Sequence, residues 1–519
     1  PFKIDEMKKI VLLSLIFFAL VTGGCKKALD INSTRVVNEE NSWNTMEDSR
    51  AKLLGVYGLT RAALADNNGH WIYGDVRMGN FDSPLRQDLK AIIRNDLKAS
   101  YPVVQELSNW RRFYAIVNAA NIFLERINEV KSKDPRYTDN NMTVDVAQVR
   151  FLRAFAYFYM VRIWGDVPFI TSSRDGKFEN TKRADKNAIL EFVQAEMVSA
   201  AEVLPYRYSV NDIQQPGQYY NEGEGRWNGT LVRKLTAYAV AAQVAAWQGK
   251  YADVTVYTKI VLDNYSRAAM AYSPTDYLSG RRGLFFDKNN NQLFAFGFIF
   301  GHQDATFVGN IESLTLAEPI VNKNLPDIFV PKDSILSIFK EANDGRFNID
   351  STGVAHSQLY FTNFLGKYPI FSKIKCMQDG SSDPTFRIFS SAILFTRLED
   401  VTLLRAEALG VLGERQGAID ALNIVRTFRY NVDNVGATNS SYIPYSPERS
   451  GNLIDAIFNE RNKEFMGEGY RWYDLVRYHK IVQRDAKFVQ LINSGGIYWP
   501  IAQSLIDQNP ELVQNSYWK

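Results

Sequence analysis

The sequence has few of the residues that build disulfide frameworks and metal sites. Among its 519 residues are two cysteines, Cys25 and Cys376, and four histidines. Two cysteines cannot form a disulfide framework or a cysteine-rich zinc site, and the scattered histidines form no His-x-x-x-His pair. The segment from Asp287 to Asn291 resembles the start of a calcium loop, but Gln292 stands where that loop needs glycine. We therefore expect no metal site.

A large excess of charge of either sign is also missing. The chain has 60 lysines and arginines against 57 aspartates and glutamates, a formal net charge of +3. This is too little for a chain of this length to act on nucleic acid through its net charge, so we expect no nucleic-acid partner. The sequence also contains no glycine-rich phosphate loop, dinucleotide fingerprint, His-Glu-x-x-His or Gly-x-Ser-x-Gly motif. We accordingly expect no cofactor and no enzyme activity.

Long apolar runs are absent except near the N-terminus. Two lysines precede an apolar run over 10–21, which is followed by Thr22-Gly23-Gly24-Cys25. Positive, apolar and small residues in this order indicate a secretory signal, and twelve helical residues rise only about 18 Å, too little to span a bilayer. A cysteine after two glycines resembles the bacterial lipobox, in which the cysteine is acylated. We expect a signal peptide over 7–24, lipidation at Cys25 and a tether over 25–43; the alternative is an ordinary signal followed by a chance cysteine.

Helical periodicity dominates the remaining sequence, and two helix pairs stand out. Apolar residues recur every three or four positions over 231–245, Gly249 interrupts them, and the pattern resumes over 254–261. A second pair over 401–425 has Gly413 in the corresponding place. This spacing resembles a tetratricopeptide unit, but the two glycines lie 413 − 249 = 164 residues apart, so the pairs form no contiguous array. Further helices are expected over 45–65, 110–127, 149–163, 188–204 and 453–482.

Residues 266–393 have sparse helical periodicity and many Gly, Pro, Asn and aromatic residues. The best strand signal there covers 292–300. We predict a mainly α fold in which dispersed tetratricopeptide-like hairpins form a scaffold, with a loop-rich lobe carrying a few short strands. The expected organisation is a single unit over 44–519, with the helical scaffold at 44–265 and 394–519 and the loop-rich lobe at 266–393.

Three glutamates at a spacing of four, Glu460, Glu464 and Glu468, are expected to share one face of a helix. They would repel one another unless cations lie between them, and Arg461, Arg471 and Arg477 could supply these. The functional alternative is a carboxylate pair for glycoside hydrolysis, which requires two carboxyl groups facing each other across a cleft. Because one helical row points its carboxylates the same way, we favour a structural ion-pair network.

Five segments of the chain carry recognisable motifs. Residues 453–478 carry a Glu-Arg…Glu…Glu-Gly-x-Arg-Trp-x-Asp-Leu pattern, and residues 150–168 carry Arg-Phe-Leu-Arg-Ala…Gly-Asp-Val-Pro. Residues 110–121 contain Trp-x-x-x-Tyr…Asn, 404–408 contain Ala-Glu-Ala, and 499–515 form a closing segment. Together and in this chain order, the five segments resemble the SusD/RagB family of Bacteroidetes nutrient-binding lipoproteins.

The resemblance implies a protein held by N-terminal lipid on the outer face of the outer membrane. It implies docking of the helices on a SusC-like TonB-dependent transporter, capture of an oligosaccharide, less often a peptide, and delivery of that ligand to the transporter without catalysis. Two other classes of function remain open, a surface glycoside hydrolase and a structural accessory of the transporter that binds no ligand.

Aromatic residues are abundant, with 27 Tyr, 32 Phe and 9 Trp. Aromatic faces suit sugars because one face of a pyranose is apolar, while its hydroxyls need polar partners. From placement and residue type, the expected ligand face lies in the segment 70–82 and in the lobe; core packing is the alternative for each aromatic. The candidates are Trp71, Tyr73, Arg77, Asn80, Phe300, Phe307, Tyr360 and Phe361.

Overall fold

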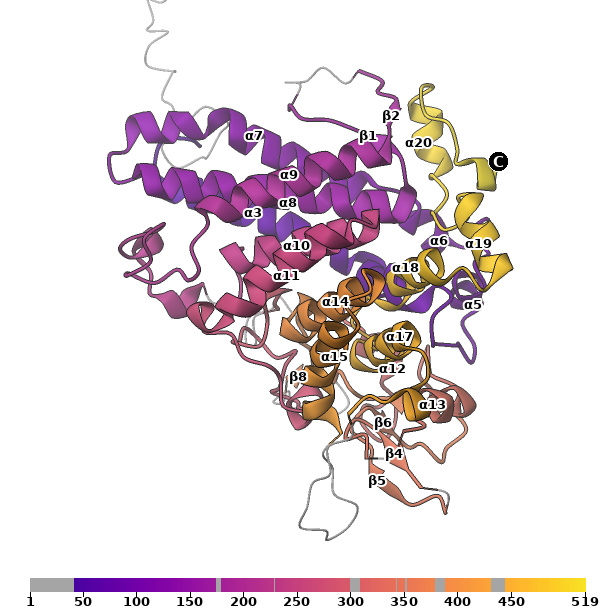
Figure 1. Cartoon of the computed structure of the whole chain (residues 1–519). Coiled ribbons are helices and arrows are strands. Elements are labelled where there is room, and N and C mark those ends of the chain that lie inside the picture. The colour runs from indigo at the N-terminus through magenta and orange to yellow at the C-terminus, as the bar shows by residue number, and fades with distance from the viewer. Residues whose placement is uncertain are drawn as a thin grey trace, which may run out of the picture.

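The computed structural model describes residues 42–173, 179–227, 229–298, 309–341, 343–350, 352–378, 388–430 and 444–519. The expected signal peptide, Cys25 and nearly all of the expected tether lie outside these residues. The described chain is mainly helical, with a few short strands gathered mostly in one lobe (Figure 1), as the sequence predicts.

Long helices form the N-terminal half of the scaffold close to their expected positions. They are α3 (Met46–Ala65), α7 (Arg111–Lys133), α8 (Asp139–Trp164) and α9 (Lys186–Val203). The side chains of Thr45, Thr138 and Asp185 cap the N-termini of α3, α8 and α9 by accepting hydrogen bonds from backbone N–H groups. Shorter elements join them: η1 (Asp66–Asn68), α4 (Gly69–Trp71), the π-helical turn η2 (Ile72–Val76), α5 (Gln87–Ile93), α6 (Pro102–Leu107), η4 (Tyr219–Asn221) and η5 (Glu224–Arg226).

Both expected helix hairpins are present. The first consists of α10 (Lys234–Gln248) and α11 (Tyr251–Asn264), the second of α14 (Leu398–Val411) and α15 (Arg415–Arg429). Gly249 and Gly413 have φ values of 80° and 84°, a left-handed conformation that glycine adopts at the end of a helix without strain. Although the hairpins are far apart in sequence, α11 packs against α14, and α9 packs against α10. Figure 1 shows the resulting stack, from α7, α8 and α9 through α10 and α11 to α14 and α15.

The expected single helix over 453–482 is wrong, because the structure divides it into α17 (Leu453–Glu464) and α18 (Arg471–Val482). Gly467 and Gly469 lie in the break with φ values of 78° and 83°. Glu468 therefore lies beyond the end of α17 and does not continue a helical row. The chain closes with α19 (Ala486–Asn493), α20 (Gln503–Gln508) and η8 (Ser516–Trp518); α16 (Pro447–Ser450) precedes α17.

The loop-rich lobe carries paired short strands, all antiparallel. The pairs are β3 (Phe294–Phe296) with β10 (Ile393–Thr396), β4 (Asn348–Ile349) with β5 (Ala355–Ser357), β6 (Phe361–Thr362) with β7 (Ile370–Phe371), and β8 (Met377–Gln378) with β9 (Ile388–Phe389). The strand expected over 292–300 is β3, and its last two expected residues lie outside the described residues. The lobe also contains η6 (Tyr265–Ala268), η7 (Asp276–Leu278), α12 (Glu312–Thr315) and α13 (Lys332–Ile338), and β1 (Val167–Pro168) pairs with β2 (Arg183–Ala184) in the scaffold.

One large hydrophobic cluster joins the lobe to the scaffold. It includes Phe155 of α8, Phe294 of β3 and Phe395 of β10, whose rings lie 4.7–6.1 Å apart between centroids. In the described part of the chain, no helix combines the length and the apolar character needed to cross a membrane. The same residues contain no group of three or more His, Cys, Asp or Glu side chains arranged to hold a metal ion.

Candidate functional site

Three of the expected ligand residues, Trp71, Tyr73 and Arg77, are buried in the core. Trp71 and Tyr73 are 2% and 4% exposed, and Arg77 is fully buried. The Tyr73 hydroxyl donates a 2.6 Å hydrogen bond to the carbonyl of Leu107, and the Arg77 guanidinium lies 4.3 Å from the centre of the Trp472 ring. These side chains hold η2 against the C-terminal helices and expose almost no surface on which a sugar could stack, so the structure corrects their assignment to a ligand face.

The lobe candidates Tyr360 and Phe361 are also fully buried. Both rings lie 6.0 Å from that of Phe339 in edge-to-face contacts, a preferred geometry for aromatic packing. They too belong to the core rather than to a stacking surface. The remaining aromatic candidates, Phe300 and Phe307, lie outside the described residues.

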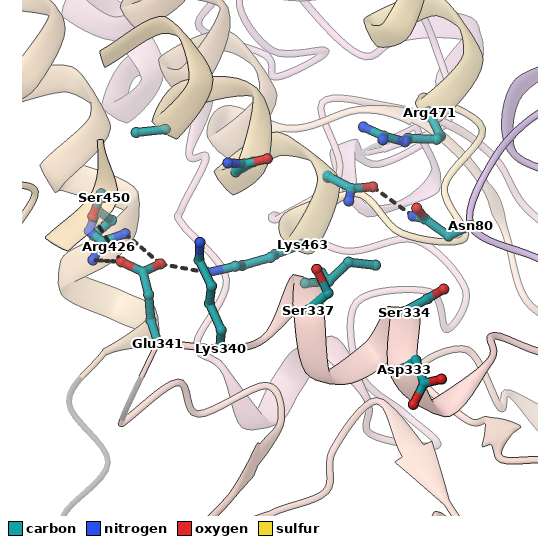
Figure 2. Close-up of a pocket in the computed structure, with 14 residues that line it drawn as sticks. Asn80, Asp333, Ser334, Ser337, Lys340, Glu341, Arg426, Ser450, Lys463 and Arg471 are labelled. Carbon is teal, nitrogen blue, oxygen red and sulfur yellow. Dashed lines mark hydrogen bonds and ion pairs between the residues drawn. The ribbon is translucent and has the colours of Figure 1, made fainter. Parts of the chain in front are cut away.

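Of the expected ligand residues that the structure describes, Asn80 lines one cavity, and the nearly fully buried Tyr73 borders a second one described below. The cavity at Asn80 has a volume of about 540 Å³ and lies between α13, α17, the first residue of α18 and the segment that follows η2. This volume is within the range of about 300–1,000 Å³ that is typical of small-molecule sites. Figure 2 shows Asn80 and Arg471 on one side of it, Glu341, Arg426 and Ser450 on the other, and α13 with Asp333, Ser334 and Ser337 along its edge.

Ion pairs close one wall of the cavity. The Glu341 carboxylate accepts hydrogen bonds from Lys463 Nζ at 2.6 Å, from Arg426 Nη2 at 3.0 Å, from the Tyr430 hydroxyl at 3.0 Å and from Ser450 Oγ at 2.9 Å. Burial opposes ionisation of this carboxyl group, but the neighbouring Lys463 and Arg426 charges outweigh it and hold the pKa of Glu341 well below its usual range. Glu341 is therefore an ionised, fully engaged carboxylate rather than a free acid or base.

Amide groups and one guanidinium form the opposite wall. Asn80 Nδ2 donates a 2.6 Å hydrogen bond to Asn462 Oδ1, which joins the segment after η2 to α17. Arg471, the first residue of α18, lies above Asn80 in Figure 2, and its Nε is buried without a hydrogen-bond partner. Of the described residues that line the cavity, none is aromatic. A ligand here would be held by hydrogen bonds and charge rather than by stacking.

The glutamates that the sequence singled out lie behind the cavity in a buried network. Glu464 is completely buried and accepts hydrogen bonds from Arg346, Arg397 and Arg429 at 2.8–3.0 Å. Despite the opposing effect of burial, these arginines hold the pKa of Glu464 well below its usual range. Glu468 pairs with Lys373 at 2.6 Å and Arg397 at 2.9 Å, and Glu460 pairs with Arg346 at 2.7 Å and Arg426 at 3.1 Å.

The cations that neutralise these glutamates are not those expected from the sequence. They come from the lobe, from the start of α14 and from α15, whereas Arg461 and Arg477 pair with Asp474 at 2.9 Å and 2.8 Å. Arg471 forms no ion pair with any described residue and lines the cavity. Its expected role between the glutamates is therefore corrected.

Sequence reasoning missed most of the cavity. Asn459, Asn462 and Lys463 occupy positions i, i+3 and i+4 of α17 and line the cavity, while Glu460 and Glu464 on the same helix point into the core. The amide-rich spacing of α17 is a signal of this face in the sequence, whereas the acidic row beside it marks the buried face. The serines of α13 gave no signal, because their position depends on how the lobe packs.

A second cavity of about 590 Å³ lies at the start of α7 and includes Asp66, Glu106, Arg111 and Arg112. Its Arg112 pairs with Asp66 in an exposed ion pair. Because none of its described polar groups is buried and unpartnered, we take the cavity at Asn80 as the candidate site and use the second one as a control.

Comparisons with known proteins agree over most of the chain. Residues 374–496 match the model of the SusD family, and residues 74–217 match a model described as "Starch-binding associating with outer membrane". SusD-like protein P38 of Formosa agariphila is 25% identical, and the alignment covers 98% of this chain and 99% of that protein. The crystal structure of a SusD homolog from Bacteroides thetaiotaomicron, 22% identical, has a TM-score of 0.72 and shares the fold.

A more similar structure extends this agreement to the sequence. The crystal structure of a SusD superfamily protein from Bacteroides thetaiotaomicron is 43% identical, with a TM-score of 0.82, and the match covers 92% of this chain and 99% of that one. This match over nearly the whole length agrees with the helix hairpins and with the family-like segment 453–478 that forms α17 and α18. The chain belongs to the SusD family.

Proposed function

We propose that this protein is a cell-surface lipoprotein that binds an oligosaccharide at the cavity beside Asn80 and delivers it to a SusC-like TonB-dependent transporter. The observation that carries the proposal is the match over nearly the whole length to a SusD superfamily structure. The description of the model that matches residues 74–217, which names starch binding and the outer membrane, supports both the ligand class and the location.

The chemistry of the cavity supports a sugar ligand. Asn80, Asn459 and Asn462 offer amide donors and acceptors, and Ser334 and Ser337 offer hydroxyl groups. Sugar hydroxyls both donate and accept hydrogen bonds, so a wall of amides and hydroxyls can satisfy several of them at once. A peptide, which the same groups could also bind, is the alternative ligand.

The arrangement of carboxylates disfavours the glycoside hydrolase alternative. That reaction needs a protonated carboxyl group on one side of the bond and a second carboxylate across from it. Glu341 is held ionised by two cations, and Glu460, Glu464 and Glu468 are buried in ion pairs. Asp333 is exposed at the edge of the cavity, and a lone exposed aspartate does not supply the opposed pair.

A binding screen tests the ligand class. The full chain should respond to glycans on a combined glycan and peptide array, without releasing cleaved products. Asn80→Ala should weaken binding of the best ligand about 2- to 10-fold, the value of one or two hydrogen bonds. Arg111→Ala, at the second cavity, should leave it unchanged. Binding to peptides alone would reassign the ligand class to peptides. Release of cleaved glycan would favour the glycoside hydrolase, and the absence of any binding on the array would favour a structural accessory of the transporter.

Membrane fractionation tests the anchor. If Cys25 carries the lipid, Cys25→Ala should move the protein from the membrane fraction to the soluble fraction, because acyl chains would be its main attachment to the bilayer. Copurification of the wild-type protein with a barrel transporter tests the partner. A variant that stays in the membrane fraction after detergent-free washing would contradict lipidation at Cys25.

A further inference from the structure

In the cavity at Asn80, the charges on the Glu341 wall are neutralised by ion pairs, whereas the charge of Arg471 on the opposite wall is not. Four cations and two anions line it: Arg426, Lys463, Lys340, Arg471, Asp333 and Glu341. Arg426 pairs with Glu341 at 3.0 Å and with Glu460 at 3.1 Å, and Lys463 pairs with Glu341 at 2.6 Å. Two cations therefore meet two carboxylates on that wall. Lys340 and Asp333 are exposed at the rim, where solvent and salt screen them.

Arg471 is the exception. Its guanidinium forms no ion pair with a described residue, and its Nε is buried without a hydrogen-bond partner. The acids nearest in sequence and space are engaged elsewhere: Asp474 pairs with Arg461 and Arg477, and the Asp75 carboxylate accepts a hydrogen bond from the backbone N–H of Gly469. Burial lowers the pKa of Arg471, but an arginine side chain stays protonated at neutral pH. A partly desolvated cation therefore faces the cavity.

Arg471 is half-buried, with its Nε shielded from solvent, and a partly desolvated cation without an ion-pair partner has lost hydration that no nearby anion replaces. Asp474 and Asp75 act on Arg471 through space, but no described residue forms an ion pair with it, so an anion that enters the cavity can take that place. The planar guanidinium fork matches a carboxylate in a bidentate geometry, and a sulfate oxygen pair can take the same place. Asn80 lies near Arg471 in Figure 2, and Asn80 and its hydrogen-bond partner Asn462 line the same cavity, where they offer amide groups to the hydroxyls of the same molecule.

We infer that the site selects an acidic oligosaccharide, whose uronate carboxylate or sulfate ester pairs with Arg471 while its hydroxyls bind the neighbouring asparagines. The inference rests on the proposed glycan-binding function and adds the charge class of the ligand. The neutralised wall at Glu341 then contacts the uncharged part of the sugar, and the exposed rim contributes little to selection.

Three matched trisaccharides test this by calorimetric titration of the full chain: trigalacturonate, galactotriose and a sulfated galactotriose. We expect an acidic trisaccharide to bind at least 10-fold more tightly than galactotriose, with an affinity that falls as salt is raised. Arg471→Gln should abolish this preference, and Arg471→Lys should retain part of it. Arg111→Gln removes an arginine charge at the second cavity and should change nothing. The two acidic arms show whether carboxylate or sulfate is preferred.

The outcomes separate the inference from the proposed function. Equal binding of galactotriose and both acidic trisaccharides, or a preference that persists in Arg471→Gln, overturns the inference and leaves glycan binding intact. No binding of these sugars or of any glycan on an array overturns both. If Arg471→Gln melts far below the wild type, its binding data do not test the inference. Arg471→Lys and the salt dependence of wild-type binding then provide the test, because a preference for acidic trisaccharides that does not change with salt also contradicts a charge contact.

Discussion

At the residue scale, Glu464 is the most heavily paired carboxylate of the network. It bonds to three arginines, and its side chain is completely buried. Glu464→Gln keeps the shape but removes the charge that these cations share, and leaving buried charges unpaired costs roughly 3–5 kcal/mol. We expect the melting temperature to fall by several degrees in scanning calorimetry.

A surface pair provides the control for Glu464. Glu222 pairs with Arg50 at 3.0 Å with both side chains partly exposed, and exposed pairs contribute only about 0–1 kcal/mol. Glu222→Gln should therefore hardly change the melting temperature. Equal effects of the two substitutions would show that the buried network does not stabilise the fold.

The residue scale is also where sequence reasoning is weakest. The abundance of aromatics is visible in the sequence, but whether Trp71 faces solvent or the core depends on which elements pack over it. Here η2 lies beneath the C-terminal helices, so its rings are buried while Asn80, a few residues later, reaches a cavity. Arg461 and Arg471 differ in the same way, since Arg461 is buried in ion pairs with Asp400 and Asp474, whereas Arg471 forms no ion pair with a described residue.

At the scale of elements, the break between α17 and α18 depends on glycine. Gly469 has a φ of 83°, and a Cβ added there would lie 2.4 Å from Nε2 of the buried His70 ring. Gly469→Ala should therefore be destabilised both by a left-handed backbone, at about 1–2 kcal/mol, and by overpacking, at a further 1–3 kcal/mol. Thermal melting should show the sum.

Gly413 separates the two contributions. Its φ is 84°, nearly that of Gly469, but no atom lies within 4 Å of an added Cβ. Gly413→Ala should cost only the backbone part, so its melting temperature should lie between those of the wild type and Gly469→Ala. If Gly413→Ala and Gly469→Ala have the same melting temperature, the close approach of the added Cβ to His70 does not destabilise the protein.

Helix pairs were predictable because their signal is local. Apolar spacing and a glycine stop define α10 with α11 and α14 with α15 within about 30 residues each. The periodicity does not predict the division of α17 from α18, because polar residues continue a helical spacing across the break at Gly467 and Gly469. Gly469 lies against η2, where its N–H donates to Asp75, and Gly467 lies against Phe371 of β7; both contacts are distant in sequence.

At the scale of the whole molecule, contacts between segments far apart in sequence determine the features that the sequence does not predict. The lobe separates α11 from α14 in the chain, yet the two helices pack together, and the lobe returns Arg346 and Lys373 to the glutamates of the C-terminal segment. The acidic row predicted a network correctly, but its cations are scattered over more than 80 residues. The candidate cavity at Asn80 forms from the same convergence, so its residues could not be assembled from any one motif.

Buried carboxyl groups make opposite contributions to stability as pH changes. Burial raises the pKa of Glu312 to about 7, that of Asp75 to about 7 and that of Asp145 to about 6. In the unfolded state these groups have ordinary pKa values near 4. Between about pH 4 and pH 7 they are therefore ionised in the unfolded state but still protonated in the folded state, so the free energy of unfolding falls as pH rises through this range. Glu464 and Glu468 have lowered pKa values, and the stability they provide is lost as pH falls below about 4.5.

The two effects together predict that the protein is most heat-stable near pH 5 and melts at a lower temperature at pH 7.5. For Glu312, a shift from about 4.5 to about 7 corresponds to roughly 3 kcal/mol. Glu312→Gln can still accept a hydrogen bond from Ser391 or from the backbone of Cys376, but it does not ionise. Its melting temperature should therefore fall less between pH 5 and pH 7.5 than that of the wild type, whereas Glu222→Gln should follow the wild type. A wild-type melting temperature as high at pH 7.5 as at pH 5 would contradict the assignment of these carboxyl groups as the main source of pH dependence.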